Sequence, residues 1–267
     1  MEEKVHTAPK SDSKQMILII IAILGMLCCV VIGSIVGFYY LFDFQMDQQA
    51  LAEETAQAQA TSTAVSQATQ VAKYEFFDDF TNNSNNWYVS PVVSAEDGWN
   101  GSINITAGKY IWFVKDVNGA EAFTWREYEN QKPVQDFDLS VDVKQASGIS
   151  GTLCPGVAFR VIFKGAYIAS YVLSICDDGQ FNVTYYDSDT GWETIQTWTP
   201  STAIRSGDWN NLSISGRGSH FVLSINNVIV SEFDDNRIPR GRAFLVLQAF
   251  NAESGSLWFD NFGVQSR

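Results

Sequence analysis

Apolar and polar residues alternate with a period of two along the C-terminal two-thirds of the chain. Every second residue is apolar in FDLSVDVK (137–144), in QFNVTYY (180–186) and in FVLSI (221–225). Because successive side chains of a strand point to opposite faces, this pattern predicts strands with one buried and one solvated face. Segments of similar character predict further strands at 74–80, 109–114, 157–163, 171–176, 193–198, 211–215, 228–233, 243–248 and 257–264.

Turn residues separate these predicted strands. Asp178-Gly179 and Asn226-Asn227 each lie between two of them, and Gly and Asn both tolerate the left-handed backbone that tight hairpins require. No helical pattern longer than two turns follows Lys73. About a dozen short strands predict an all-β sandwich over 74–267, since a single sheet of that size would leave one apolar face uncovered.

A different pattern occupies residues 16–42, where no residue is charged. At about 1.5 Å per residue, a helix of this length measures about 40 Å, more than the ~30 Å hydrocarbon core of a bilayer. A cleaved signal peptide has an apolar run of only about 7–15 residues. The segment is therefore predicted to be an uncleaved transmembrane signal-anchor helix in contact with membrane lipid.

The charges that flank this segment predict its orientation. Lys4, Lys10 and Lys14 precede it, whereas no cation follows it until Lys73. Cytoplasmic ends of membrane helices are rich in Lys and Arg. We therefore expect a single-pass protein of the plasma membrane, with residues 1–15 as a short cytoplasmic tail and the β-domain on the extracytoplasmic side.

Small residues form a stripe on the predicted helix. Gly25, Cys29, Gly33 and Gly37 recur every four residues, so they share one face where a second helix can approach closely. The stripe predicts a homodimer or a partner transmembrane helix. The general frequency of glycine in membrane helices is the alternative explanation.

Residues 43–73 link the helix to the β-domain. They are rich in Ala, Gln, Thr and Glu and contain no Gly or Pro, and their first half favours helix by propensity. The apolar positions are too small and irregular for a convincing heptad. We predict a helical or semi-rigid stalk, with a tight coiled coil as the less favoured alternative.

The charge of the chain limits its partners. The formal net charge is −13, and the excess of acidic residues lies after residue 42. Nucleic acid and anionic lipid headgroups would repel such a domain. We therefore expect no nucleic-acid partner.

Two of the four cysteines, Cys154 and Cys176, lie in the β-domain. If the predicted strands 157–163 and 171–176 pair as antiparallel neighbours around Gly165, these two cysteines come to lie opposite each other. We predict a disulfide between them, which an oxidising compartment would allow to form. Because the length of the loop is uncertain, two free thiols are the alternative.

Several short motifs in the β-domain carry a resemblance to a known superfamily. They are DDF (78–80), GW with an isoleucine three residues after the tryptophan (191–195), WNNLSI (209–214), LSINNVIV (223–230), GR (241–242) and FDNF (259–262). Over residues 74–264 the chain resembles the concanavalin A-like lectin/glucanase superfamily, and in particular its laminin G-like bacterial surface modules. The resemblance implies a jelly-roll sandwich whose first and last strands are adjacent, with a core aromatic residue at Trp192. Asn227 in place of a glycine and a long connection at 163–170 depart from the pattern.

The sequence offers little for catalysis. Of the two histidines only His220 lies in the β-domain, and nothing orients it for a Ser-His-Asp triad. Retaining glucanases of the superfamily carry a Glu-x-Asp-x-Glu strand that places two carboxylates close together, and no such string occurs here. The nearest pattern, Asp136, Asp138 and Asp142, is explained by the wet face of a strand.

Two acidic groups are candidates for a metal ion. Asp187 and Asp189 alternate in DSDTGW like the start of a calcium loop, although no later carboxylate closes the loop and a hairpin turn also explains them. Asp78 and Asp79 lie near Asp260 if the terminal strands pair. Structural calcium occurs in the superfamily, so a calcium ion is one hypothesis; we otherwise expect no cofactor.

A sugar-binding site would use aromatic faces with polar neighbours, because a pyranose ring has an apolar face. Trp99 lies in a turn-like context, Tyr110 and Trp112 share one face of GKYIWFV, and Trp125 follows nearby. These four are the predicted ligand-binding residues. Most tryptophans are expected in the core, and Trp99 is the one best placed for the surface.

These observations lead to three hypotheses about function. The first is a membrane-anchored, extracytoplasmic, non-enzymatic module that binds a glycan or a protein partner at the cell surface. The second is an accessory or structural subunit of a larger membrane protein complex. The third is a membrane-tethered glycoside hydrolase-like enzyme.

Overall fold

The chain divides into two compact units, Met1–Gln67 and Ala68–Arg267. The computed structural model describes residues 73–94, 98–117, 121–251 and 254–267, with five more residues between 52 and 59. The predicted membrane helix with its stripe of small residues, and most of the predicted stalk, lie outside the described residues. Within the described part, no helix is both long and apolar enough to cross a membrane.

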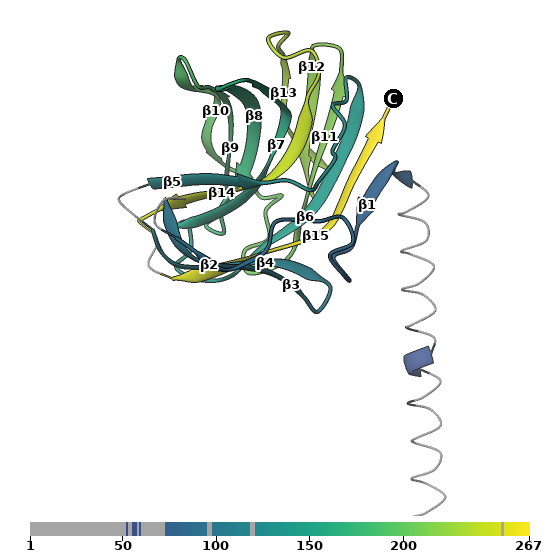
Figure 1. The fold of residues 1–267 in the computed structure, drawn as a ribbon, viewed down its shortest axis with the longest axis vertical. Helices are drawn as coiled ribbons and strands as arrows, with labels where there is room; N and C mark the ends of the chain where they lie inside the picture. The colour runs from purple at the N-terminus through teal and green to yellow at the C-terminus, as the bar shows by residue number, and fades with distance from the viewer. Residues whose placement is uncertain are drawn as a thin grey trace, which may run out of the picture. The chain divides into compact units, whose positions relative to one another are not determined.

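The second unit folds into two β-sheets, which we call sheet A and sheet B (Figure 1). Sheet A has nine strands: β1 (Phe76–Asp78), β2 (Ser90–Val93), β3 (Trp99–Thr106), β4 (Lys109–Val117), β6 (Phe137–Ser147), β11 (Asn210–Arg217), β12 (His220–Ile225), β13 (Val228–Asp234) and β15 (Gly255–Ser266). Sheet B has six: β5 (Glu121–Arg126), β7 (Leu153–Lys164), β8 (Tyr167–Ile175), β9 (Gln180–Asp187), β10 (Gly191–Pro200) and β14 (Arg242–Phe250). The predicted all-β, two-sheet sandwich is confirmed.

The order of the strands shows how distant parts of the chain meet. Sheet A runs β13-β12-β11-β6-β15-β4-β3-β2, and β1 also pairs with β15. Sheet B runs β10-β9-β8-β7-β14-β5. Phe76 of β1 lies opposite Val264 of β15, so the first and last strands are adjacent, as the resemblance implies.

The core lies between the inner faces of the two sheets. The alternating apolar residues of 137–143 are all buried, which confirms the pattern from which the strand was predicted. Aromatic contacts join the sheets: the Phe221 ring of sheet A lies 5.4 Å from the Phe159 ring and 5.2 Å from the Tyr171 ring of sheet B. These large rings fix how the two sheets pack on each other.

The β7–β8 hairpin has the register that the cysteine positions require. Gly156 lies opposite Ser174, and the same pairing carried to the ends of the strands brings Cys154 to Cys176. The disulfide between them is present, with the two Cα atoms 4.4 Å apart. The predicted long connection at 163–170 is wrong, because β7 and β8 extend until only two residues join them.

The Asn226-Asn227 turn also forms as predicted. Both residues have a positive φ, 49° and 65°, and they join β12 to β13. The Asn226 side chain donates hydrogen bonds to the Ala203 carbonyl at 2.7 Å and to Asn210 Oδ1 at 2.8 Å. These bonds hold the left-handed backbone, so asparagine serves here in place of glycine.

Strands β2, β3 and β5 were not predicted. The sequence of β3, WNGSINIT, is rich in small polar residues and reads as a turn. Gly101 in this strand lies so close to β4 that a Cβ atom there would meet the Phe113 carbonyl oxygen at 1.9 Å. Close backbone approach, rather than strand propensity, therefore explains why this segment joins the sheet.

Loss of the disulfide is expected to destabilise the domain. The bond links residues separated by 22 positions, and closure of a loop of this size stabilises a fold by about 3 kcal/mol. We predict that the Cys154→Ser/Cys176→Ser double variant loses about 2–4 kcal/mol of unfolding free energy in a urea titration. The reduced wild-type protein should match the variant, and an unchanged unfolding midpoint after reduction would contradict the prediction.

Candidate functional site

The outer face of sheet B, which points away from the core, is covered rather than open. A second buried apolar cluster lies on it, formed by Ala158, Val161, Val172, Phe244 and Val246, with Phe123 and Trp125 packed against them. An ordinary outer face of an antiparallel sheet is solvated and polar. Some part of the chain must therefore shield this face from water.

Aromatic side chains from opposite edges of sheet B meet across this face. The Trp192 ring of β10 lies 4.7 Å from the Phe123 ring of β5, and the Trp198 ring of β10 lies 5.8 Å from the Phe250 ring of β14. We call these two contacts the aromatic bridge. Since β10 and β5 are the two edge strands and neighbouring strands are about 4.8 Å apart, a flat sheet would separate them by about 24 Å.

The bridge thus requires sheet B to curl strongly. Figure 1 shows β8, β9 and β10 standing upright while β5 and β14 run across the view. This change of direction is the accumulated twist of a six-stranded sheet. The curl brings the edge strand β10 over the outer face.

Four polar side chains lie on the same covered face. Ser174, Asn182, Thr184 and Gln248 are each at most 9% exposed, and each has a buried side-chain oxygen with no hydrogen-bond partner among the described residues. Asn182 lies opposite Ser174, and Ser174 lies opposite Gly156. The register therefore places Gly156 of β7, Ser174 of β8 and Asn182 of β9 in one row across the face.

Unpaired oxygens make the empty, covered face costly. A buried polar group without a partner costs about 1–3 kcal/mol, whereas an aromatic contact contributes about 0.5–1.5 kcal/mol beyond its buried area. These oxygens oppose burial of the face, whereas the buried apolar cluster and the two ring contacts of the bridge favour it. A ligand that donates hydrogen bonds to them would remove this cost.

The face carries no charge at its centre. Within the described residues, its carboxylates are Glu121 and Glu127 at the two ends of β5, about 20 Å apart along a strand. Burial raises the pKa of Glu127, and the Arg242 guanidinium, 2.8 Å away, opposes this. A retaining glycosidase needs two carboxyl groups about 5–5.5 Å apart, so this face is suited to binding and not to hydrolysis by such a pair.

The structure separates the four aromatic residues predicted to bind a ligand. Trp99, Tyr110 and Trp112 have no exposed surface, and the Trp99 and Trp112 rings stack at 6.4 Å within the core. The prediction that Trp99 lies at the surface is wrong, because Trp99 begins β3 on the same inward face as Ile103. Trp125 is the one of the four that lies on the outer face of sheet B.

Trp192 also differs from the expectation. The resemblance implied a core aromatic residue at this position, but Trp192 is 47% exposed. Its ring packs on Tyr186 at 4.8 Å and on Phe123 at 4.7 Å. The curl of sheet B gives this residue its place in the aromatic bridge.

Asp78, one of the residues proposed for calcium, is engaged in a turn. Its carboxylate accepts hydrogen bonds from Phe80 N, Asn85 Nδ2 and Trp87 Nε1, each at 2.8 Å. The neighbouring Asp79 accepts one from Thr81 N at 3.1 Å. These contacts explain why two acids begin the DDF motif.

Asp187 forms the hairpin turn that was the alternative to a calcium loop. Its carboxylate accepts hydrogen bonds from Tyr167 Oη at 2.7 Å, Tyr185 Oη at 3.1 Å and the backbone N–H groups of Asp189 and Thr190. The hydrogen bond from Tyr167 is the main cause of a lowered Asp187 pKa. In the part of the chain that the structure describes, no group of three or more His, Cys, Asp or Glu side chains is arranged to hold a metal ion.

Asp260 lies in a different setting, on the outer face of sheet A. It is opposite Asp142 of β6, and directly opposed residues have Cβ atoms about 4.5–5.5 Å apart. Burial is the main cause that raises the pKa of Asp260 to about 7. The negative charges of Asp142 and Asp79 raise this pKa further, whereas the hydrogen bond from Asn261 N lowers it. Asp142 in turn accepts hydrogen bonds from Asn211 Nδ2 at 2.7 Å and Asn261 Nδ2 at 2.8 Å.

Two tryptophans flank this carboxylate pair. Trp258, two residues before Asp260, lies 6.2 Å from Trp209 between ring centroids, and Lys109 Nζ lies 5.6 Å from the Trp258 ring centroid. The outer face of sheet A therefore carries two carboxyl groups in different environments beside an aromatic surface. The outer face of sheet B differs, because its centre carries no charged side chain.

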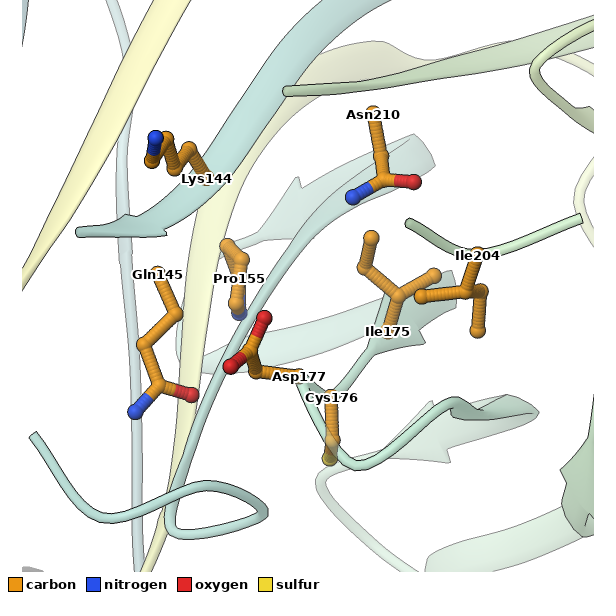
Figure 2. A pocket seen from close by; sticks show the side chains of 8 residues that line it. All are labelled: Lys144, Gln145, Pro155, Ile175, Cys176, Asp177, Ile204 and Asn210. Carbon is orange, nitrogen blue, oxygen red and sulfur yellow. The ribbon is translucent and has the colours of Figure 1, made fainter. Parts of the chain in front are cut away.

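A small cavity lies near the disulfide, lined by Lys144, Gln145, Pro155, Ile175, Cys176, Asp177, Ile204 and Asn210 (Figure 2). It has room for about one water molecule. Gln145, one of the lining residues, has a buried side-chain oxygen without a hydrogen-bond partner in the described part of the chain. The cavity is too small for a sugar.

Most residues of the sheet B face were not predicted from the sequence to form a site. Asn182 and Thr184 occupy the polar positions of the alternating segment 180–186, and Ser174 does the same in β8. Alternation assigned such residues to the outer face, which is correct. It gave no sign that Trp192 and Trp198 would lie over that face.

The two packed sheets and their strand order define a class of protein: a concanavalin A-like β-sandwich domain. A family model described as a 3-keto-alpha-glucoside-1,2-lyase-like domain matches residues 75–265. The chain belongs to this family. No curated protein matches the sequence.

Solved structures share the fold at low sequence identity. A β-glucanase of Bacillus licheniformis matches with a TM-score of 0.53 and 9% identity, over 72% of this chain and 98% of the other. A laminarinase from Flavobacterium sp. UMI-01 matches with 0.53 and 11%, over 72% and 100%. A protein of unknown function with a galectin-like fold from Bacillus subtilis matches with 0.51 and 11%, over 72% and 96%. At these identities the likeness establishes the fold alone.

The raised pKa of Asp260 predicts a dependence of stability on pH. Between the ordinary aspartate pKa near 4 and about 7, the folded protein holds a proton that the unfolded chain has released, so stability falls as pH rises through this window. We predict that Asp260→Asn is more stable than wild type by about 1–2 kcal/mol at about pH 8, a figure that allows for solvent screening. Near pH 4 the difference in stability should vanish.

Urea titrations across this pH range measure the effect. Asp189→Asn is the matched control, since Asp189 is exposed on a hairpin turn and should show no such difference. A stability gain of Asp260→Asn that is the same at all pH values would contradict the assignment.

Proposed function

We propose that this protein is a membrane-anchored, extracytoplasmic carbohydrate-binding module whose ligand is an uncharged saccharide. The binding surface is the outer face of sheet B. The observation that carries the proposal is a set of four buried oxygens that have no partner among the described residues. They belong to Ser174, Asn182, Thr184 and Gln248, on the face that also carries the aromatic bridge. Residues 16–42 anchor the module, and residues 43–73 hold it away from the bilayer.

A saccharide matches this surface in two ways. Its hydroxyl groups donate hydrogen bonds, and the orphan atoms are acceptors or hydroxyls. Its ring has an apolar face that stacks on aromatic side chains, and Trp125, Trp192 and Trp198 line the same surface. Since the centre of the face has no cation, an acidic saccharide gains no ion pair there and meets an acidic domain.

The relatives support a sugar ligand. The family model is described as 3-keto-alpha-glucoside-1,2-lyase-like, and the similar solved structures include a β-glucanase and a laminarinase. Proteins that share this sandwich therefore accommodate saccharides. Nothing in these relationships selects one linkage, so the proposal is limited to the class of ligand.

A glycoside hydrolase is the second candidate function. The observation that favours it is the opposed pair Asp142 and Asp260, of which Asp260 has a pKa of about 7 and so suits a general acid. Trp258 beside the pair would supply an aromatic surface. This pair lies on sheet A, so binding and hydrolysis are assigned to different faces and can be tested separately.

Titration calorimetry with the full-length protein, in a detergent without a sugar head group, tests the first candidate. The probes are laminarihexaose, cellohexaose and maltohexaose, with oligogalacturonate as the acidic comparison. We expect at least one neutral hexasaccharide to bind, and Trp192→Ala to weaken it about tenfold, or about 1.4 kcal/mol. Trp209→Ala is the matched control, since Trp209 directly precedes β11 of sheet A and contacts Trp258, and it should leave the affinity unchanged.

The outcomes separate the candidates. Weaker binding by Trp209→Ala and not by Trp192→Ala would move the site to sheet A. Release of reducing ends from the same hexasaccharides, lost in Asp260→Asn, would favour the hydrolase. Tighter binding of oligogalacturonate than of all three neutral probes would refute the proposed ligand class.

The membrane anchor has a separate test. If residues 16–42 span the bilayer with the domain outside, protease added to intact cells should cut within 43–73, the predicted stalk outside the packed sandwich, and release the domain as a soluble fragment. Immunoblotting of cells and medium measures the release. A protein that is cut only after the membrane is permeabilised would contradict the proposed orientation.

A further inference from the structure

The proposed saccharide surface is closed in this structure. Ser174 is fully buried, and Asn182 and Thr184 are at most 7% exposed, although all three lie on an outer face. The register brings β10 beside them: Thr194 lies opposite Thr184, and the segment that contains Trp198 lies opposite Asn182. A ligand reaches these side chains only if the cover moves.

Strand β10 is the part of the cover that is held least firmly. As an edge strand it pairs with β9 alone, and two register shifts interrupt that pairing, between Thr194 and Gln196 and between Gln196 and Thr199. Its side chains are half-buried or exposed along its whole length. A strand with one interrupted ladder and little buried surface opens more readily than the strands inside a sheet.

Besides the ladder with β9, the strand β10 is attached by the aromatic bridge and by an exposed ion pair between Glu193 and Arg237, 2.6 Å long. Trp192 contacts Phe123 of β5, and Trp198 contacts Phe250 of β14. Both contacts are between rings, with no hydrogen bond or ion pair in these pairs. They can separate without leaving a buried polar group unpaired, and their separation exposes the four orphan oxygens to water.

We propose that β10 is a lid: the aromatic bridge opens to admit a saccharide to the outer face of sheet B and closes over it. This inference rests on the proposed saccharide-binding function for the identity of the ligand. The opening itself does not depend on the ligand. In the free protein the closed state shields unpaired oxygens, so the lid opens spontaneously and a bound saccharide holds it shut.

Thiol labelling measures the opening without any ligand. Thr184→Cys places a near-isosteric thiol on the covered face, and Val183→Cys places one on the same strand but in the core between the sheets. The full-length variants are treated with iodoacetamide, and the peptide that contains residue 183 or 184 is quantified by mass spectrometry. We expect the thiol at 184 to react at least about tenfold faster than that at 183 in the absence of denaturant.

Loss of the bridge should speed this reaction. Phe123→Ala removes one partner of Trp192 and is expected to raise the labelling rate at 184 several-fold while leaving that at 183 unchanged. Phe113→Ala, an exposed phenylalanine on sheet A, is the matched control and should change neither rate. Equal, slow labelling at 183 and 184 would show that only global unfolding exposes the face, and would overturn the lid.

The saccharide completes the test. The tightest-binding of the three neutral hexasaccharides, at saturating concentration, should slow labelling at 184 at least about tenfold. Faster labelling, or no change despite calorimetric binding, would overturn closure over the ligand. If no hexasaccharide binds, the proposed function fails, whereas the rates at 183 and 184 still decide whether the lid exists.

Discussion

Burial of every second side chain between two sheets is the constraint on which the rest of this structure depends. Phe221 of sheet A packs on Phe159 and Tyr171 of sheet B, and these rings occupy the inner positions of three separate strands. Once the inner faces are fixed, each outer face is fixed as well, because the side chains of a strand alternate. Any functional surface must then be built on the outer faces, the strand ends or the loops.

The twist of sheet B makes its outer face unusual. Six strands accumulate enough rotation to bring β10 to β5 and β14, so the sheet covers part of itself. The cover buries Ser174, Asn182, Thr184 and Gln248 without giving their oxygens partners. Stability alone would favour apolar side chains at these positions, and this is the reason why we propose a ligand for this face.

The two outer faces differ in charge and hence in chemistry. The face of sheet A carries Asp142 and Asp260 in direct opposition, together with lysines and tryptophans, and its titration falls near neutral pH. The centre of the sheet B face is uncharged and aromatic. One sandwich thus presents an uncharged aromatic face, for which we propose sugar binding, and a face where proton transfer is chemically feasible. Variants of Trp192 and Asp260 therefore report on separate questions.

The sequence by itself determined the features that depend on near neighbours. Alternation gave the two-sheet sandwich, the opposition of Cys154 and Cys176 followed from one hairpin register, and Asn226-Asn227 marked a turn. Only the tertiary structure decided which aromatic residues are accessible: Trp99 is buried because it lies on the inward face of β3, and Trp192 is exposed and lies beside Phe123. Alternation predicts on which face of a sheet a side chain lies. What covers that face depends on the summed twist of six strands, and residues far apart in the chain contribute to that twist.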